Sequence, residues 1–145
     1  MADKQIEILQ TTNTSSMRID HVAIWTRDLE GMRNFYTHYF DAVSGSGYYN
    51  HSKEFRSYFL SFGSECRLEL MEMPVVATNK NDYRKHHTGI AHLAFKVGSR
   101  DRVDQITDML RQDGFEIISP GRMTGDGYYE SAAFDPEKNR IEILA

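Results

Sequence analysis

The segment IDHVAI at residues 19–24 recurs in this chain as IAHLAF at residues 90–95. Each copy alternates apolar and small or polar residues, a pattern typical of a β-strand with two different faces. Each copy also places one histidine at its third position, His21 in the first and His92 in the second. The two histidines lie 71 residues apart, which indicates an internal repeat.

A second pair of segments supports the repeat. RLEL at residues 67–70 recurs as RIEI at residues 140–143, and the glutamates Glu69 and Glu142 lie 73 residues apart. Both segments alternate in the same way and are typical of strands. The chain therefore contains two halves, each with one histidine strand and one glutamate strand at nearly matching positions.

Strand alternation predicts that all four polar residues lie on the same kind of face. Apolar Val22 and Ile24 share the face that packs under a helix, which leaves His21 and Ala23 on the other face. The three remaining segments divide in the same way. A solvated face with cross-strand His–Glu pairs is the structural alternative. Two imidazoles and two carboxylates that converge on one point are ligands for a divalent metal ion, which favours a metal site.

The remaining sequence predicts a β-α-β-β-β order in each half. Asp28 and Ser99 precede apolar stripes at helical spacing and are expected N-caps, and Gly114 is the expected end of the second helix. In the first half we expect strands at 18–26, 55–62 and 66–73, a poorly marked strand near 43–50, and a helix at 29–40. In the second half we expect strands at 89–97, 115–119, 128–134 and 140–144, and a helix at 100–113.

These elements predict an α+β fold in which two paired β-α-β-β-β modules form a curled mixed sheet around a metal-binding cavity. Residues 1–16 are expected to be a flexible leader, and residues 17–145 a single domain. Within it, module one spans 17–76, a linker spans 77–88, and module two spans 89–145. Neither module is long enough to bury its own sheet and helix, so the two should pair.

Composition excludes several classes of protein. A net charge of −4 disfavours nucleic acid and anionic membranes as partners. The single cysteine, Cys66, excludes an internal disulfide and a thiolate zinc cluster. It alternates with Leu68 and Leu70 and is expected to be buried. No segment resembles a membrane span or a secretory signal, so a cytoplasmic location is expected.

At the four strand segments, and at the turn region from Thr124 to Asn139, the chain resembles the vicinal oxygen chelate superfamily over residues 18–145. This superfamily includes glyoxalase I, methylmalonyl-CoA epimerase, extradiol dioxygenases and thiol transferases acting on fosfomycin. The resemblance implies paired modules, often a homodimer, with one divalent metal ion held by His21, Glu69, His92 and Glu142. The full His-Glu-His-Glu set resembles the glyoxalase I arrangement. Trp25 stands where glyoxalase I commonly has an arginine for glutathione.

Such a site points to a metal-dependent lyase or isomerase of the glyoxalase type. The ion (nickel, zinc, cobalt, manganese or iron(II)) would stabilise an enediolate formed from a small α-hydroxycarbonyl or its thiol adduct. The resemblance implies Glu142 as the catalytic base, with Glu69 serving the opposite substrate face. Two alternatives stay open: a metal-free binding module of the bleomycin-resistance type, and an iron(II) extradiol dioxygenase or an epimerase.

Other residues near the tetrad are candidates for substrate binding. Arg67, Arg140 and Lys96 share faces with the four residues, and one of them would hold a carboxylate, a phosphate or a thiol-cofactor group if it is not simply a surface charge. The aromatic candidates for an apolar pocket, for which ordinary packing is an equal alternative, are Trp25, Tyr58, Tyr128 and Tyr129.

Overall fold

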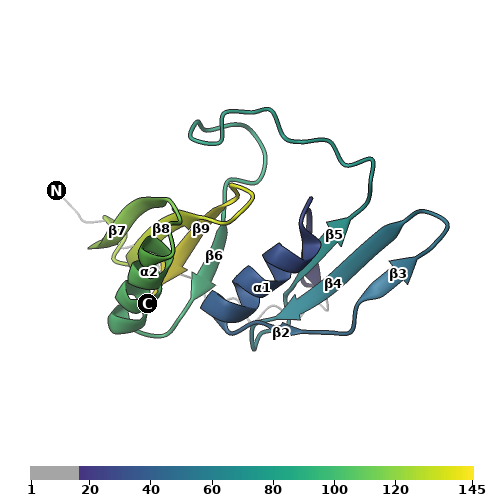
Figure 1. Cartoon of the computed structure of the whole chain (residues 1–145). Coiled ribbons are helices and arrows are strands. Elements are labelled where there is room, and N and C mark those ends of the chain that lie inside the picture. The colour runs from purple at the N-terminus through teal and green to yellow at the C-terminus, as the bar shows by residue number, and fades with distance from the viewer. Residues whose placement is uncertain (1–16) are drawn as a thin grey trace.

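A computed structural model describes residues 17–145, so the leader predicted at 1–16 lies outside the described residues. The described chain forms two modules, each with one helix packed against a small sheet (Figure 1). The α+β class and the paired β-α-β-β-β modules are confirmed. The strands are divided between two mixed sheets, one in each module.

Module one contains the histidine strand and the glutamate strand as direct neighbours. Its sheet has the order β1-β5-β4-β2, with β3 paired to β4, and β1 runs parallel to β5. The Gly45–Gly47 segment divides the poorly marked second strand into two short pieces. Its elements are β1 (His21–Trp25), α1 (Leu29–Phe40), β2 (Val43–Ser44), β3 (Tyr48–Asn50), β4 (Phe55–Ser61) and β5 (Arg67–Glu72).

Module two repeats this topology. Its sheet has the order β6-β9-β8-β7, and β6 runs parallel to β9 as β1 does to β5. β6 begins at Leu93, so His92 lies one residue before it, whereas the sequence predicted a strand from residue 89. The elements are β6 (Leu93–Lys96), α2 (Arg100–Gln112), β7 (Ile117–Met123), β8 (Tyr129–Phe134) and β9 (Arg140–Leu144).

Both helices begin at the predicted N-caps. The Asp28 side chain accepts a hydrogen bond from the backbone N–H of Gly31 at 2.9 Å, and the Ser99 side chain accepts one from that of Arg102 at 3.2 Å. Each cap of this kind typically stabilises a helix by about 1 kcal/mol. Gly114 follows α2 with φ of 86°, the left-handed conformation expected after a helix end.

The two modules share one hydrophobic core. The ring of Tyr36 on α1 lies 5.8 Å from Phe95 of β6, and Phe40 lies 4.6 Å from the same ring. Phe35 of α1 packs 5.1 Å from Phe115, just after α2. Helix α1 therefore buries apolar surface against both sheets, as expected for two modules that are each too small to fold alone.

The turn between β8 and β9 enters this core through a buried carboxylate. Asp135 is 1% exposed and accepts hydrogen bonds from the Tyr36 hydroxyl and from the backbone N–H groups of Glu137 and Asn139, at 2.8–2.9 Å. Burial raises the pKa of Asp135, although these donors oppose the shift. Burial, with a further contribution from Asp135, also raises the pKa of Tyr36 well above its usual value. Because the Asp135 carboxylate accepts all these hydrogen bonds, it holds the turn in one conformation.

The fixed turn ties module two to the start of α1. Glu137 accepts hydrogen bonds from the backbone N–H of Arg27 at 2.7 Å, from that of Asp28 at 2.9 Å, and from the Thr26 hydroxyl. These donors lie at the amino end of α1, where free N–H groups and the helix dipole favour an anion. The contact joins segments about 110 residues apart in sequence.

The prediction of a buried Cys66 is wrong, because this residue is exposed. Leu68 and Leu70 are buried as their alternation indicates, but β5 begins only at Arg67. Cys66 therefore belongs to the bend before the strand, where the two-residue period no longer applies. Neither helix within residues 17–145 has the length and apolarity needed to cross a membrane.

Candidate metal centre

Each module brings its histidine and glutamate together as a pair. In module one, His21 Nε2 lies 3.6 Å from Glu69 Oε2, and in module two, His92 Nε2 lies 3.2 Å from Glu142 Oε2. Two donors about 2.1 Å from one ion and separated by 90–109° would lie roughly 3.0–3.4 Å apart. The 3.2 Å pair of module two falls within this range, and the 3.6 Å pair of module one lies just beyond it, so a small side-chain movement would bring both of its atoms onto one divalent ion.

The strand register explains why the pairs form twice. In module one, Ala23 of β1 is the register partner of Glu69, and in module two, Ala94 of β6 is the partner of Glu142. Each histidine precedes its alanine by two residues and so lies diagonally opposite the glutamate on the same face. The alanines leave room for the two polar side chains to meet.

All four side chains lie on the sheet faces directed away from the helices, as the alternation predicted. The glutamates are flanked in sequence by leucines and isoleucines that are at most 4% exposed and contribute to the core. The side chains of His21 and His92 are 39% and 38% exposed, and those of Glu69 and Glu142 are 14% and 21% exposed. The carboxylates are thus partly shielded while the imidazoles stay accessible.

The two pairs belong to different sheets and do not meet within one chain. Among residues 17–145, no three or more His, Cys, Asp or Glu side chains form a cluster that would hold a metal ion. The pairs stand instead as two separate half-sites, each with one imidazole nitrogen and one carboxylate. Their donor chemistry fits a divalent ion, and each half-site leaves most coordination positions open.

His21 is held by a ring of contacts that the sequence analysis did not identify. Its Nδ1 lies 2.8 Å from Asp20 Oδ2, and Arg67 donates a hydrogen bond to the same oxygen at 2.6 Å. The Arg67 guanidinium stacks on Phe59 at 4.4 Å, and the Phe59 ring meets the His21 ring edge-on at 5.2 Å.

This ring of contacts affects the charge of Asp20 and the orientation of His21. Hydrogen bonds from His21 and Arg67 lower the pKa of Asp20 and keep it ionised. A carboxylate on Nδ1 orients the imidazole with Nε2 toward Glu69. Asp20 precedes His21 directly, and strand pairing places Phe59 opposite Glu69.

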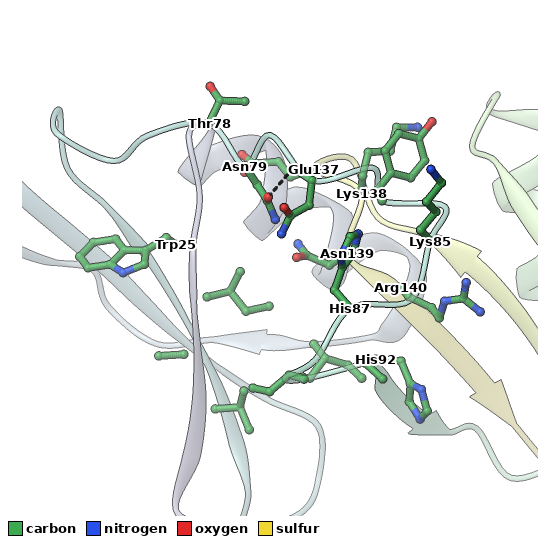
Figure 2. Close-up of a pocket in the computed structure, with 18 of the residues that line it drawn as sticks. Trp25, Thr78, Asn79, Lys85, His87, His92, Glu137, Lys138, Asn139 and Arg140 are labelled. Atoms are coloured by element: carbon green, nitrogen blue, oxygen red, sulfur yellow. Dashed lines mark hydrogen bonds between the residues drawn. The ribbon is translucent and has the colours of Figure 1, made fainter.

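A cleft of about 760 Å³ lies between β1, the strand β6 and the linker that joins the modules. Figure 2 shows His92, Arg140 and His87 at one side of this cleft and Trp25 at the other. His87, a residue of the linker, bonds to the backbone carbonyl of Asp82 at 3.1 Å. The cleft reaches one half-site through His92.

The aromatic candidates divide into two groups. Tyr58 donates to Glu30 at 2.9 Å and Tyr129 to Asp104 at 2.9 Å, so both face the helices rather than the half-sites. Trp25 is 45% exposed, lines the cleft and packs on Phe55. Tyr128 is exposed in the turn before β8.

Comparison with known proteins places the chain in a family. The Glyoxalase/Bleomycin resistance protein/Dioxygenase superfamily matches residues 18–143. The chain belongs to this superfamily. The name covers glyoxalases, resistance proteins and dioxygenases, so membership does not by itself assign an activity.

Solved structures of glyoxalase I share the fold, and a bacterial protein is similar in sequence. Glyoxalase I from Zea mays superimposes with a TM-score of 0.71 at 22% identity over 88% of this chain, which spans 44% of the maize chain. The trypanothione-dependent glyoxalase I of Leishmania major gives 0.69 at 23% identity, covering 89% of this chain and 86% of that one. An uncharacterized protein of Bacillus subtilis, YqjT, is 26% identical over 132 residues, covering 86% of this chain and 96% of its own length.

Proposed function

We propose that this protein is a divalent-metal-dependent lyase or isomerase of the glyoxalase type, acting on a small α-hydroxycarbonyl or its thiol adduct. The observation that carries the proposal is the pair of equivalent half-sites, in which a histidine nitrogen and a glutamate oxygen lie 3.6 Å and 3.2 Å apart, close to the spacing of two ligands on one ion. A solvated sheet face has no need for the same pair at both repeat positions.

We further propose that the complete site forms between two copies of the chain. Each chain offers two half-sites on different sheets, and within residues 17–145 they do not combine. In a twofold symmetric dimer, module one of each copy would face module two of the other, which gives two complete sites. Each site would then contain His21 and Glu69 from one copy and His92 and Glu142 from the other.

The chain's own residues would supply the acid–base chemistry. A bound divalent ion polarises a carbonyl and stabilises negative charge on oxygen. Glu142 would take the proton from the carbon next to the carbonyl and return it to the neighbouring carbon, which isomerises the substrate. Glu69, on the facing half-site, would perform the same transfer for the opposite substrate face. The half-buried position of both carboxylates keeps them near the substrate while leaving them able to exchange protons.

The first test is metal content. Elemental analysis of tag-free protein should find about one divalent ion per chain, and His92→Ala should lose it. His38→Ala, which changes a histidine on the unrelated helix α1, is the matched control and should retain the ion. Metal-loaded protein should then convert methylglyoxal with at least one thiol, and Glu142→Gln should bind metal but lose turnover.

The same measurements separate the alternatives. An absence of bound ion after incubation with nickel, zinc and manganese would refute the proposal and favour a metal-free binding module. Oxygen consumption by the iron-loaded protein would favour a dioxygenase, in which Glu69 has no ligand role.

A further inference from the structure

Each half-site has an arginine beside its histidine. In module one, Arg67 of β5 is the register partner of His21. In module two, the first register pair of β6 and β9 is Leu93 with Ile141. Extending this pairing back by one residue places Arg140 beside His92. Both arginines precede their glutamate by two residues and therefore share its face. The repeat thus places an arginine on the same sheet face as each half-site.

The Arg67 guanidinium is fully engaged. It bonds to Asp20 at 2.6 Å and stacks on Phe59 at 4.4 Å, and both of these partners contact His21. Arg67 is therefore a positioning residue that holds Asp20 and the Phe59 ring against the imidazole.

Module two lacks both partners. Ala91 stands where Asp20 stands in module one, and Ala132, the register partner of Glu142, stands where Phe59 stands. Arg140 forms no ion pair with any residue in 17–145, and its guanidinium lies 5.8 Å from the Phe134 ring. A buried or shielded guanidinium favours a planar anion as its partner.

The surroundings of Arg140 are also cationic. Lys85 and Lys138 line the same cleft as His92 and Arg140, and Figure 2 shows the four along one side of it. The lysines have acidic partners, Asp82 for Lys85 and Glu116 for Lys138, both at 3.7 Å. Among residues 17–145, Glu137 is the one carboxylate that lines the cleft, and it is occupied by the start of α1. In this part of the chain, Arg140 is therefore a cation of the cleft with no carboxylate partner.

We propose that Arg140 binds an anionic group of the substrate, a carboxylate or a phosphate, and so selects α-hydroxycarbonyl compounds that carry a negative charge. This inference rests on the proposed function and names the substrate class of the same site. Arg140 lies two residues from Glu142, roughly 7 Å along an extended strand. The anionic group is thus attached close to the reacting carbons, within the reach of one arginine side chain.

The test uses pairs of probes that differ only in the anionic group. Malate and 2-hydroxybutanoate present the same hydroxy acid, but malate has a second carboxylate in place of a methyl group. In the same way, 3-phosphoglycerate adds a phosphate to glycerate. Isothermal titration calorimetry on the zinc-loaded protein should show that, in one of the two pairs, the probe with the additional anionic group binds about tenfold or more tighter than its partner. Arg140→Gln should abolish that preference while zinc content is unchanged.

Two further variants serve as controls. Arg111→Gln, which changes an arginine on the outer part of α2, should keep the preference. Arg67→Gln should weaken zinc binding yet keep the ratio between the two probes. A preference for malate identifies a carboxylate and a preference for 3-phosphoglycerate identifies a phosphate. Equal binding of both members of both pairs, or a preference that survives in Arg140→Gln, would overturn the inference.

A failure of the proposed function can be distinguished from a failure of this inference about Arg140. If the protein binds no metal, the titrations are repeated on the metal-free protein, where an Arg140-dependent preference for the probe with the additional anionic group would still support the anion site. No such preference there would overturn it as well.

Discussion

Replacing Glu137 tests how the two modules are held together. Its carboxylate accepts three hydrogen bonds at the start of α1, from the backbone of Arg27 and Asp28 and from the Thr26 hydroxyl. Glu137→Ala removes all three acceptors at once, whereas Glu137→Gln keeps a carbonyl oxygen that can accept the same bonds. The pair of variants separates hydrogen bonding from charge.

The expected magnitude follows from the burial of the donors. Thr26 is 0% exposed, so its hydroxyl proton would have no water to bond to, which costs about 1–3 kcal/mol. The N–H groups of Arg27 and Asp28 are exposed and can bond to water, so their loss adds only about 0.5–1.5 kcal/mol together. Glu137→Ala should therefore lower the free energy of unfolding by about 1.5–4.5 kcal/mol. Glu137→Gln loses only the charge at the helix start, about 0.3–1 kcal/mol.

Urea unfolding at pH 7, followed by far-UV circular dichroism, measures both losses. The dependence on urea should keep its slope, because the surface exposed on unfolding does not change. Equal losses for the alanine and glutamine variants would refute the role of the three hydrogen bonds. A loss below about 0.5 kcal/mol for Glu137→Ala would show that solvent replaces the contact.

Three other variants test local features. Asp20→Ala removes the carboxylate on His21 and should weaken zinc binding about 10–100-fold by titration calorimetry. Burial and a hydrogen bond to Asp113 raise the pKa of Tyr39 to about 12. An unfolded tyrosine ionises near pH 10, so this stabilisation is complete below pH 10 and is lost as the pH rises toward 12. The unfolding free energy of Tyr39→Phe, measured with urea, should not show this loss as the pH rises from 10 toward 12. Gly47→Ala would place a Cβ 2.8 Å from the Tyr58 ring and should cost about 1–3 kcal/mol in unfolding free energy.

Matched controls accompany these variants. Glu65→Gln removes an exposed carboxylate paired with Arg18 and should leave zinc binding unchanged. Gly125→Ala has nothing within 4 Å of the added Cβ and should change stability by less than about 0.5 kcal/mol. If Asp20→Ala bound zinc as tightly as the wild type, the carboxylate would not orient the imidazole. If Gly47→Ala were as harmless as its control, the Tyr58 ring would move aside.

Local patterns in the sequence predicted most of the fold. The alternation of apolar residues identified the faces of β1, β5, β6 and β9, and Asp28 and Ser99 marked both helix starts. These features depend on residues that are neighbours in sequence, so the sequence alone predicts them. The repeat then identified two equivalent His–Glu pairs, which the structure brings to 3.2 and 3.6 Å.

Features that depend on long-range contacts were not predicted. Cys66 follows the period of Leu68 and Leu70, but the extent of a strand is set by its pairing partner and β5 starts later. The contact between Glu137 and the start of α1 joins distant turns that no local pattern relates. The difference between Arg67 and Arg140 likewise appears only when Phe59 and Ala132 are placed opposite the glutamates.

The central claim is a metal site shared between two copies of the chain, and mixed dimers test it most directly. Co-expression of His21→Ala and His92→Ala chains with different tags allows purification of dimers that contain one of each. In a shared site, one of the two sites keeps His21 from the second chain and His92 from the first. The mixed dimer should then bind about half an ion per chain, although each variant alone binds none. If the mixed dimer binds none while the wild type binds metal, each site is built within one chain and the account of a shared site is wrong.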